Sequence, residues 1–532
     1  MANNLDNNDV PSIIDVSSIP SENDSFVQIM DIDTATTATT NSHHNVSLPS
    51  LTPALSLKLL PRYASIGTEA PLSRTQICAT ITARDIPPEH DNSRAPVDIV
   101  VALDVSGSMS GNKLALCKVT LKLLLGELQE KDRFGLVTFS NNASTVIPAQ
   151  RLTQANKDRA LQEIERVHAT GSTNMSGGIS LAMQEMQSID TPNEVRCVFL
   201  LTDGHANIGI VNASGIIDLT KNCLQQLSSS SNNNNGNSTN NPPVTIHTFG
   251  YGRDHDDELL RELSLSSPAG AGTYYFVETD DNVVSAFGDA LGGILSVVAQ
   301  NTILTISVVP QGGSVNLIDI HHKSKIMLDE GKVYKVTMGD FYAQETRDLI
   351  FSMTLAEGSS DVDTPVPHVT VSMVYTDTID KKMVRAPVVV ASIDRPFGTS
   401  TVSKEDPYVA WQWLRINTTT IMTNAQDIAK RGDISAARSI INDQLKEIRK
   451  VVAESNSNNP LASQLISDLN AVLGGLVDYR AFRGGGGMAI RNKIQSHQMQ
   501  RSSEATRDAK NVYRTDRRMK MAKKCYKSAF GK

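Results

Sequence analysis

The sequence predicts an α/β fold in which a doubly wound, mainly parallel sheet is inserted in a β-sandwich and followed by a helical domain. Three observations lead to this architecture. Buried strands alternate with helices between residues 96 and 299, short β-type runs lie on both sides of that region, and a helical apolar period fills residues 405–500. The chain has 532 residues, which is enough for about three domains of roughly 100–200 residues each.

The first 50 residues are polar, rich in Asn, Asp, Ser and Thr, and lack an amphipathic period. We expect residues 1–50 to be a disordered tail. The N-terminus has no basic and apolar segments of a secretory signal, and no run of 18 or more apolar residues predicts a transmembrane helix. The expected location is therefore the cytoplasm, with the nucleus as the alternative.

Composition excludes several functional classes. The chain has 50 Lys and Arg against 57 Asp and Glu, a net charge of −7 that argues against a protein built wholly for nucleic-acid binding. Its five cysteines are scattered without a CxxC pair. This spacing excludes a zinc ribbon, a RING, a thioredoxin-type motif and a disulfide scaffold.

Residues 51–95 contain the first strands of the predicted sandwich. Apolar and polar residues alternate over 55–59, as in a half-buried strand, and a second β-rich run covers 77–83. Residues 300–398 supply the rest of the sandwich. Its six late strands are expected at residues 304–309, 315–320, 334–338, 349–355, 369–375 and 384–392.

Residues 96–299 form the predicted α/β domain. The run over 97–103 is almost continuously apolar, which is typical of a strand buried on both faces. Further strands are expected at residues 134–139, 144–147, 195–201, 244–249 and 273–277, and helices at about 114–128, 154–167, 176–186, 213–227 and 281–299. The Ser/Asn-rich tract 228–243 cannot build a core, so it predicts a surface loop at the amino ends of the strands.

Residues 405–500 form the predicted helical domain. Helices are expected at 408–422, 424–430, 434–453 and 461–477, with Gly432 as a C-cap and the glycine run 484–487 as the end of the packed part. Residues 501–532 hold 11 Lys and Arg but only 3 Asp and Glu, a net charge of +8. This basic tail is either a site for nucleic acid, anionic membrane or an acidic partner, or a solvated helix or disordered tail without a specific ligand.

The sharpest signal for chemistry is a set of oxygen side chains near strand ends. Asp104, Ser106 and Ser108 follow the first buried strand, Thr173 precedes a helix, and Asp203 follows another buried strand. Ligands bind open α/β sheets at the carboxyl ends of strands, so we expect these side chains to converge. Two carboxylates and three hydroxyls suit a hard cation such as Mg²⁺, or Mn²⁺, and disfavour zinc.

The ordered set of DxSxS, GSTNM and LLTDG resembles the metal-ion-dependent adhesion site of the von Willebrand factor type A (VWA) domain. The resemblance implies that Ser106, Ser108 and Thr173 bind the metal directly, and that Asp104 and Asp203 act largely through water. Residues 333–348 resemble the β segment that follows the domain in eukaryotic proteins of the plant VWA–RING type, and residues 408–501 resemble the helical domain of VWA/Hint-type proteins. Neither a RING nor a Hint module is visible, so ubiquitin-ligase activity and autoprocessing are not implied.

The function expected from these residues is a non-enzymatic, metal-dependent scaffold that binds a carboxylate of a partner protein. His205 is the only candidate base near the site, and an exposed histidine at its rim is the favoured interpretation. Two alternatives stay open. One is a substrate-binding component associated with a ubiquitin ligase, and the other is a nucleic-acid or membrane adaptor that uses the basic tail.

Overall fold

The computed structural model describes eleven stretches of the chain: residues 52–72, 74–86, 94–228, 241–252, 255–267, 271–277, 280–309, 316–355, 366–455, 458–502 and 511–531. The predicted disordered tail 1–50 lies outside these residues, as does most of the Ser/Asn-rich tract. Within the described residues, no helix is both long and apolar enough to cross a membrane.

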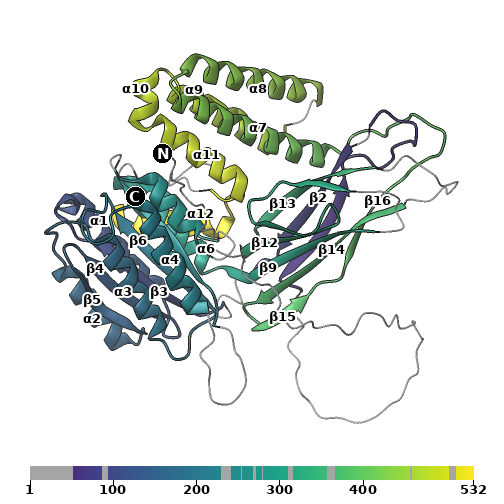
Figure 1. Ribbon diagram of the computed structural model, residues 1–532. Coiled ribbons are helices and arrows are strands. Elements are labelled where there is room, and N and C mark those ends of the chain that lie inside the picture. The colour runs from purple at the N-terminus through teal and green to yellow at the C-terminus, as the bar shows by residue number, and fades with distance from the viewer. Residues whose placement is uncertain are drawn as a thin grey trace, which may run out of the picture. The chain divides into compact units, whose positions relative to one another are not determined.

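The α/β domain contains a six-stranded sheet with the order β5-β4-β3-β6-β7-β8 (Figure 1). Only β5 runs antiparallel to its neighbour. The strands are β3 (Val97–Asp104), β4 (Arg133–Phe139), β5 (Ala143–Arg151), β6 (Val195–Thr202), β7 (Val244–Tyr251) and β8 (Tyr274–Val277). The helices are α1 (Asn112–Glu127), α2 (Gln154–Arg166), α3 (Met175–Gln187), α4 (Ala213–Ser228), α5 (Asp257–Leu265) and α6 (Asp280–Ile294), with a 3₁₀ turn, η2 (Gly107–Met109).

Helices cover both faces of this sheet, which explains the continuous apolar run of β3. Val101 and Leu103 pack in a core with α1, α2 and α6, whereas Val100 and Ala102 pack in a second core with α3, α4 and α5. All eight residues of β3 are buried. The predicted doubly wound, mainly parallel sheet is confirmed, and α5 is a helix that the sequence analysis did not predict.

The β-sandwich consists of a four-stranded sheet, β1-β2-β13-β10, and a six-stranded sheet, β11-β12-β9-β14-β15, in which β16 also pairs with β14. Its strands are β1 (Leu55–Pro61), β2 (Arg74–Ala83), β9 (Val297–Val308), β10 (Leu317–Ile320), β11 (Lys325–Asp329), β12 (Val333–Tyr342), β13 (Thr346–Thr354), β14 (Val366–Asp377), β15 (Lys382–Arg385) and β16 (Val389–Ile393). Strand β2 pairs with β13 from Arg74↔Thr354 to Thr82↔Thr346. This pairing of an early with a late strand is what an inserted α/β domain requires.

Three details of the sandwich differ from the prediction. Helix α6 ends at Ile294 rather than at residue 299, because β9 already begins at Val297 and pairs with β12. The expected strand 384–392 is two strands, β15 and β16, which pair with different parts of β14. Strand β11 was not predicted because its apolar residues do not alternate with polar ones.

The helical domain contains α7 (Pro407–Lys430), α8 (Ile434–Ser455), α9 (Pro460–Gly475), α10 (Tyr479–Ala481) and α11 (Gly487–Met499). The two helices expected over 408–430 are one continuous helix, in which the Thr423 hydroxyl donates to the Thr419 carbonyl. Gly432 has a φ of 96°, which suits the predicted turn between α7 and α8. The glycine run does not end the packed part: a π-helical turn, η5 (Phe482–Gly486), leads directly into the buried α11.

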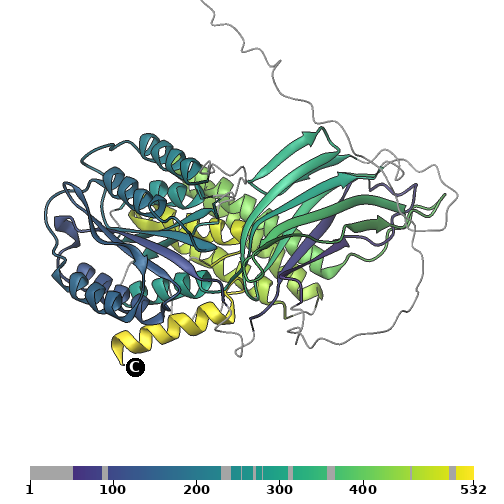
Figure 2. The same cartoon turned by 90° about the horizontal axis from the view of Figure 1, so that it is seen from below.

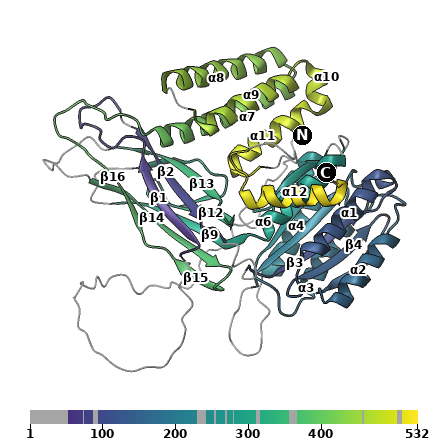
Figure 3. The ribbon, with the colours of Figure 1, turned by 180° about the vertical axis from the view of Figure 1, so that it is seen from behind.

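The basic tail returns to the α/β domain. Residues 516–530 form α12 (Asp516–Phe530), which lies beside α6 and α1 (Figures 2 and 3). Close approach depends on two glycines of α6: a Cβ at Gly288 would lie 2.8 Å from the Ala522 Cα, and one at Gly292 would lie 2.9 Å from the Arg518 Cα. In the described part of the tail, a freely solvated or disordered segment is therefore ruled out.

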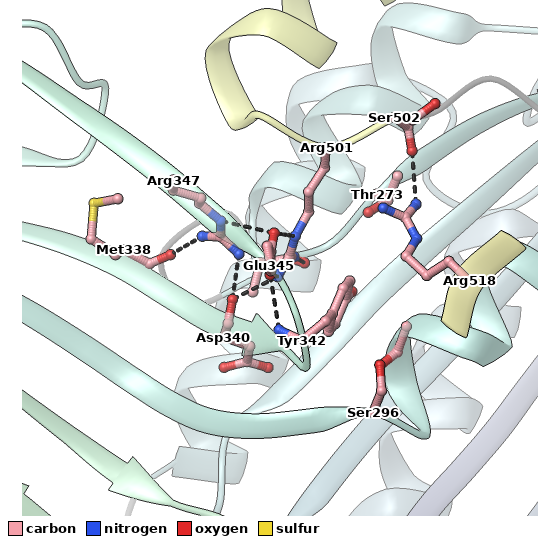
Figure 4. Close-up of polar contacts among 12 residues, drawn as sticks. Thr273, Ser296, Met338, Asp340, Tyr342, Glu345, Arg347, Arg501, Ser502 and Arg518 are labelled. Atoms are coloured by element: carbon pink, nitrogen blue, oxygen red, sulfur yellow. Dashed lines mark hydrogen bonds and ion pairs between the residues drawn. The ribbon is translucent and has the colours of Figure 1, made fainter. Parts of the chain in front are cut away.

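A buried arginine junction, defined here as Arg347, Arg501, Arg514 and Arg518 with Glu345 and Asp289, connects these parts. Figure 4 shows the side chains of Arg347, Arg501, Arg518 and Glu345. Arg501 Nε donates to Glu345 Oε1 at 2.7 Å, and Arg347 Nε donates to the same oxygen at 2.9 Å. Arg514 Nε donates to Asp289 Oδ1 at 2.7 Å, and Arg518 pairs with the other Asp289 oxygen. The junction thus ties the tail to α6 and to the sandwich.

Candidate metal centre

The five predicted metal-site residues lie at the carboxyl end of the α/β sheet. Asp104 is the last residue of β3, and Asp203 directly follows β6, the neighbouring parallel strand. The loop that carries Thr173 is held against the loop after β3, because Gly107 N–H donates to the Gly171 carbonyl at 3.0 Å. Three segments far apart in the sequence therefore meet at one edge.

Asp104 is fully buried and fixed on both carboxylate oxygens. The Ser106 backbone N–H donates to Oδ1 at 2.8 Å, and the Thr202 hydroxyl donates to Oδ2 at 2.6 Å. Burial raises the pKa of this carboxyl, the two hydrogen bonds act in the opposite direction, and the negative charge of Asp203 adds to the increase. A cation at this position would favour the ionised form.

Ser106, Ser108 and Asp203 bring their oxygens into a short chain. Ser106 Oγ lies 3.1 Å from Ser108 Oγ, and Ser108 Oγ donates to Asp203 Oδ1 at 2.7 Å. Adjacent oxygens around an octahedral Mg²⁺, with bonds near 2.1 Å, are about 3 Å apart. The separation of the Ser106 and Ser108 hydroxyls therefore fits two adjacent ligands of one hard cation.

Thr173 reaches the same place from the start of α3. The position that a Cβ at Gly204 would take lies 3.5 Å from Thr173 Oγ1 and 3.9 Å from Ser108 Oγ. The Thr173 backbone N–H donates to Asn207 Oδ1 at 2.8 Å, so the loop after Asp203 also holds the threonine in place. The structure brings together all five residues that the sequence singled out.

Two further residues take part that the sequence analysis did not identify. The Lys113 ammonium, in the first turn of α1, forms an ion pair with Asp203 Oδ2. Thr202 orients Asp104, as described above. Thr202 could have been identified from the sequence, because its hydroxyl stands at the end of a buried strand. No local pattern distinguishes Lys113 from other surface lysines.

Histidine, cysteine and acidic side chains form no separate metal cluster in the described part of the chain, which contains no group of three His, Cys, Asp or Glu side chains able to hold a metal ion. His205 is exposed in the loop after Asp203, as expected of a rim histidine. All five cysteines are free thiols.

Comparison with known proteins supports the fold. Residues 98–289 match the family model of the von Willebrand factor type A domain. A solved structure, the von Willebrand factor type A protein from Catenulispora acidiphila, superposes with a TM-score of 0.58 at 15% identity over 80% of this chain and 92% of that one.

Two curated relatives are similar over parts of their length. The uncharacterized protein sll0103 of Synechocystis is 26% identical over 306 residues, covering 57% of this chain and 66% of that protein. The E3 ubiquitin-protein ligase WAV3 of Arabidopsis thaliana is 26% identical over 265 residues, covering 49% of this chain and 31% of that protein. The chain thus spans less than two thirds of either relative.

The ordered motifs, the sheet order and the family match agree on one assignment. Residues 98–289 of this chain form a von Willebrand factor type A domain.

Proposed function

We propose that this chain is a non-enzymatic scaffold that binds a carboxylate of a partner protein through Mg²⁺ or Mn²⁺. Asp104, Ser106, Ser108, Thr173 and Asp203 would hold the ion. The observation that carries the proposal is that Ser108 Oγ lies 3.1 Å from Ser106 Oγ and 2.7 Å from Asp203 Oδ1. VWA domains commonly mediate protein–protein interactions, which agrees with this function.

The donor set explains why a partner would be needed. Ser106, Ser108 and Thr173 contribute neutral hydroxyl oxygens, and Mg²⁺ prefers six ligands. When bound, the ion would supply an electrophilic centre with open positions for an anionic oxygen. Asp104 is held by Thr202 and Ser106, so it can accept hydrogen bonds from water at the ion.

The surroundings favour binding over catalysis. A hydrolytic site needs a positioned base beside the activated water. His205 is exposed, and the site oxygens contact other hydroxyls, carboxylates and the Lys113 ammonium. In this proposal the site hydroxyls and carboxylates serve to hold an ion, and none of the contacts described pairs a hydroxyl with a histidine base.

One alternative keeps specific support. The similarity to WAV3 over 49% of the chain favours a component that presents substrates to a ubiquitin ligase, and this role would use the same carboxylate site. The basic tail is less suited to nucleic acid or membrane, because Arg501, Arg514 and Arg518 are buried in ion pairs.

Calorimetric titration of Mg²⁺ tests the site. We expect Thr173→Ala to weaken Mg²⁺ binding at least about tenfold, because one direct oxygen is lost. Ser172→Ala is the matched control, since the hydroxyl removed belongs to the neighbouring residue. Equal Mg²⁺ affinity in the wild type and Thr173→Ala would refute the assignment.

Capture experiments then test the partner. Proteins retained by the wild type in Mg²⁺ should be released by EDTA and should not be retained by Thr173→Ala. Capture that is unaffected by EDTA would contradict a metal-dependent contact even if Mg²⁺ binds.

A further inference from the structure

A cavity of about 560 Å³ lies where the VWA domain, the sandwich and the helical domain meet. Its wall is formed by α5, by the turn between β10 and β11, by α7 and by the end of α11. Small-molecule sites have volumes of about 300–1,000 Å³ and occur preferentially at domain interfaces. The lining includes no residue of the candidate metal centre, so a ligand here would have a separate role.

One part of the wall is apolar. Each of the elements that meet at the cavity contributes one apolar side chain to it: Leu265 from α5, Ile320 from β10, Ile416 from α7 and Met499 from α11. Ile320 is fully buried, and the other three are half-buried. A ligand with an apolar body would therefore find apolar contacts from all three domains.

Two polar groups of the lining have no internal partner. The Ser324 backbone N–H donates to His322 Nδ1 at 3.1 Å, so the neutral imidazole carries its proton on Nε2. Among the described residues, neither this Nε2–H nor the Lys323 ammonium has a hydrogen-bond or ion-pair partner. Two donors from adjacent residues of the lining are therefore available to an acceptor.

The buried guanidinium of Arg415 gives this region an excess of positive charge. Arg415 lines the cavity and is 1% exposed. Its hydrogen bonds go to three neutral oxygens, which belong to the Gln412 side chain and to the carbonyls of His497 and Asp348. No carboxylate is hydrogen-bonded to this guanidinium among the described residues.

The pKa of His322 responds to the same positive charge. Burial, together with the charges of Arg347, Arg415 and Lys323, lowers the pKa of His322 to about 4. The imidazole is therefore neutral at pH 7. Surrounding cations that disfavour a further positive charge favour a negative one.

Two carboxylates limit how much negative charge the cavity can accept. Asp319 forms an ion pair with Lys325, and His321 Nδ1 lies 3.4 Å from its Oδ2. Glu262 is exposed on α5 and has no ion-pair partner among the described residues. Three cationic side chains and two carboxylates line the cavity, which gives a net charge of +1 with both histidines neutral. This balance suits a single anionic group rather than a polyanion.

We propose that this cavity binds a small amphiphilic acid with one carboxylate. The carboxylate accepts hydrogen bonds from the Lys323 ammonium and from His322 Nε2–H, and the apolar chain packs against Leu265, Ile416 and Met499. Hydrogen bonds between ionised groups are about twice as strong as those between neutral groups, which selects for the charged head group. Each methylene of the chain that becomes buried should tighten binding about three- to fourfold.

Titration of octanoate into the full chain tests the proposal. The rings of Trp413 and His321 pack edge to face with centroids 5.1 Å apart, and His321 lines the cavity, so tryptophan fluorescence should report binding. We expect saturable binding with a dissociation constant on the order of 0.1–1 mM, and saturation-transfer NMR of the ligand provides a second measurement. Octylamine and 1-octanol, which have the same chain, should bind at least about tenfold more weakly.

Two variants separate the head group from the cavity. Lys323→Met removes the ammonium but keeps an apolar side chain, so it should weaken octanoate binding at least about fivefold. Lys446→Met on α8 is the matched control, because that lysine side chain is 77% exposed and remote from the lining. Thr420→Phe places a ring in the cavity from an exposed position of α7 and should weaken octanoate binding without a change of charge. Thermal melts verify that each variant is folded.

The other outcomes overturn the proposal. Absence of saturable octanoate binding up to about 3 mM excludes the site. Octylamine that binds as tightly as octanoate contradicts the positive charge excess. Weaker binding in Lys323→Met with unchanged binding in Thr420→Phe places the acid on the exposed turn and outside the cavity. Unchanged binding in both variants places it elsewhere on the molecule.

Discussion

The candidate metal centre and the arginine junction are both polar clusters, but they are built in opposite ways. At the metal centre, short side chains from three loops contact each other where the sheet meets solvent, and Ser108 itself is exposed. At the junction, long side chains converge in the interior: Asp289 and Arg518 are 0% and 1% exposed. The first cluster is the one that we propose to accept an external ion, whereas in the second each carboxylate is paired with two buried guanidinium groups.

This difference determines what each cluster contributes. A buried charge is costly unless it is paired and hydrogen-bonded, so the junction holds the tail only while all partners are present. Tyr275 supports it by donating from its hydroxyl to Asp289 Oδ2 at 3.2 Å. At the candidate metal centre Ser108 is exposed, so we expect the loss of its hydroxyl to have little effect on folding.

The largest expected effect comes from breaking the junction. Asp289→Ala leaves Arg514 and Arg518 buried without their carboxylate, and we expect the free energy of unfolding to fall by about 3–5 kcal/mol. Urea unfolding followed by circular dichroism measures this change. Lys524→Ala on α12 is the control, because Lys524 forms an exposed pair with Glu127 and should change stability by less than about 1 kcal/mol. Similar losses in the two variants would contradict the difference between buried and exposed pairs.

The sequence identified the residues of the candidate metal centre because their signal is local. Asp104, Ser106 and Ser108 lie within five residues of one another, and their place after a buried strand predicts where they point. The same reasoning located Asp203 at the end of β6. The strand–helix alternation predicted the sheet topology. That topology in turn predicted that Thr173 would lie close to the other site residues.

The junction gave no such signal because its partners are distant in the sequence. Arg501 and Glu345 are separated by 156 positions, and Arg514 and Asp289 by 225. The tail composition indicated only positive charge, and a charged run is usually solvated. These arginines are buried because glycines of α6 allow α12 to pack closely against it. No pattern in the tail sequence indicates this packing.

The next prediction concerns the loss of folding stability at acidic pH. We expect this loss to arise from a histidine near the junction rather than from the candidate metal centre. Burial, with the nearby charges of Arg501 and Arg518, lowers the pKa of His247 to about 3. The unfolded chain binds a proton at this histidine below its usual pKa near 6.5, whereas the folded chain does not. Its contribution to stability is therefore present above pH 6.5 and is lost as the pH falls toward 3.

Unfolding at two pH values measures this contribution. Between pH 7 and pH 5 we expect His247 to account for a loss of about 2 kcal/mol. Asp340, whose pKa is raised to about 6 by burial, acts in the opposite direction, since its protonated form is favoured in the folded chain. Comparing the wild type with His247→Gln isolates the histidine, and an unchanged pH dependence in that variant would contradict the assignment.

The smallest change in stability is expected at the metal centre itself. Ser108→Ala removes the hydroxyl that lies between Ser106 Oγ and Asp203 Oδ1. Because Ser108 is exposed and Asp203 keeps its ion pair with Lys113, the free energy of unfolding should change by no more than about 0.5 kcal/mol. Mg²⁺ affinity should nevertheless fall about tenfold or more, since a proposed direct ligand is lost. Chemical denaturation and calorimetry of the same preparation measure both quantities, with the exposed neighbour Ser110→Ala as the control. A variant that loses stability but keeps its Mg²⁺ affinity would show that this hydroxyl supports the fold and does not bind the ion.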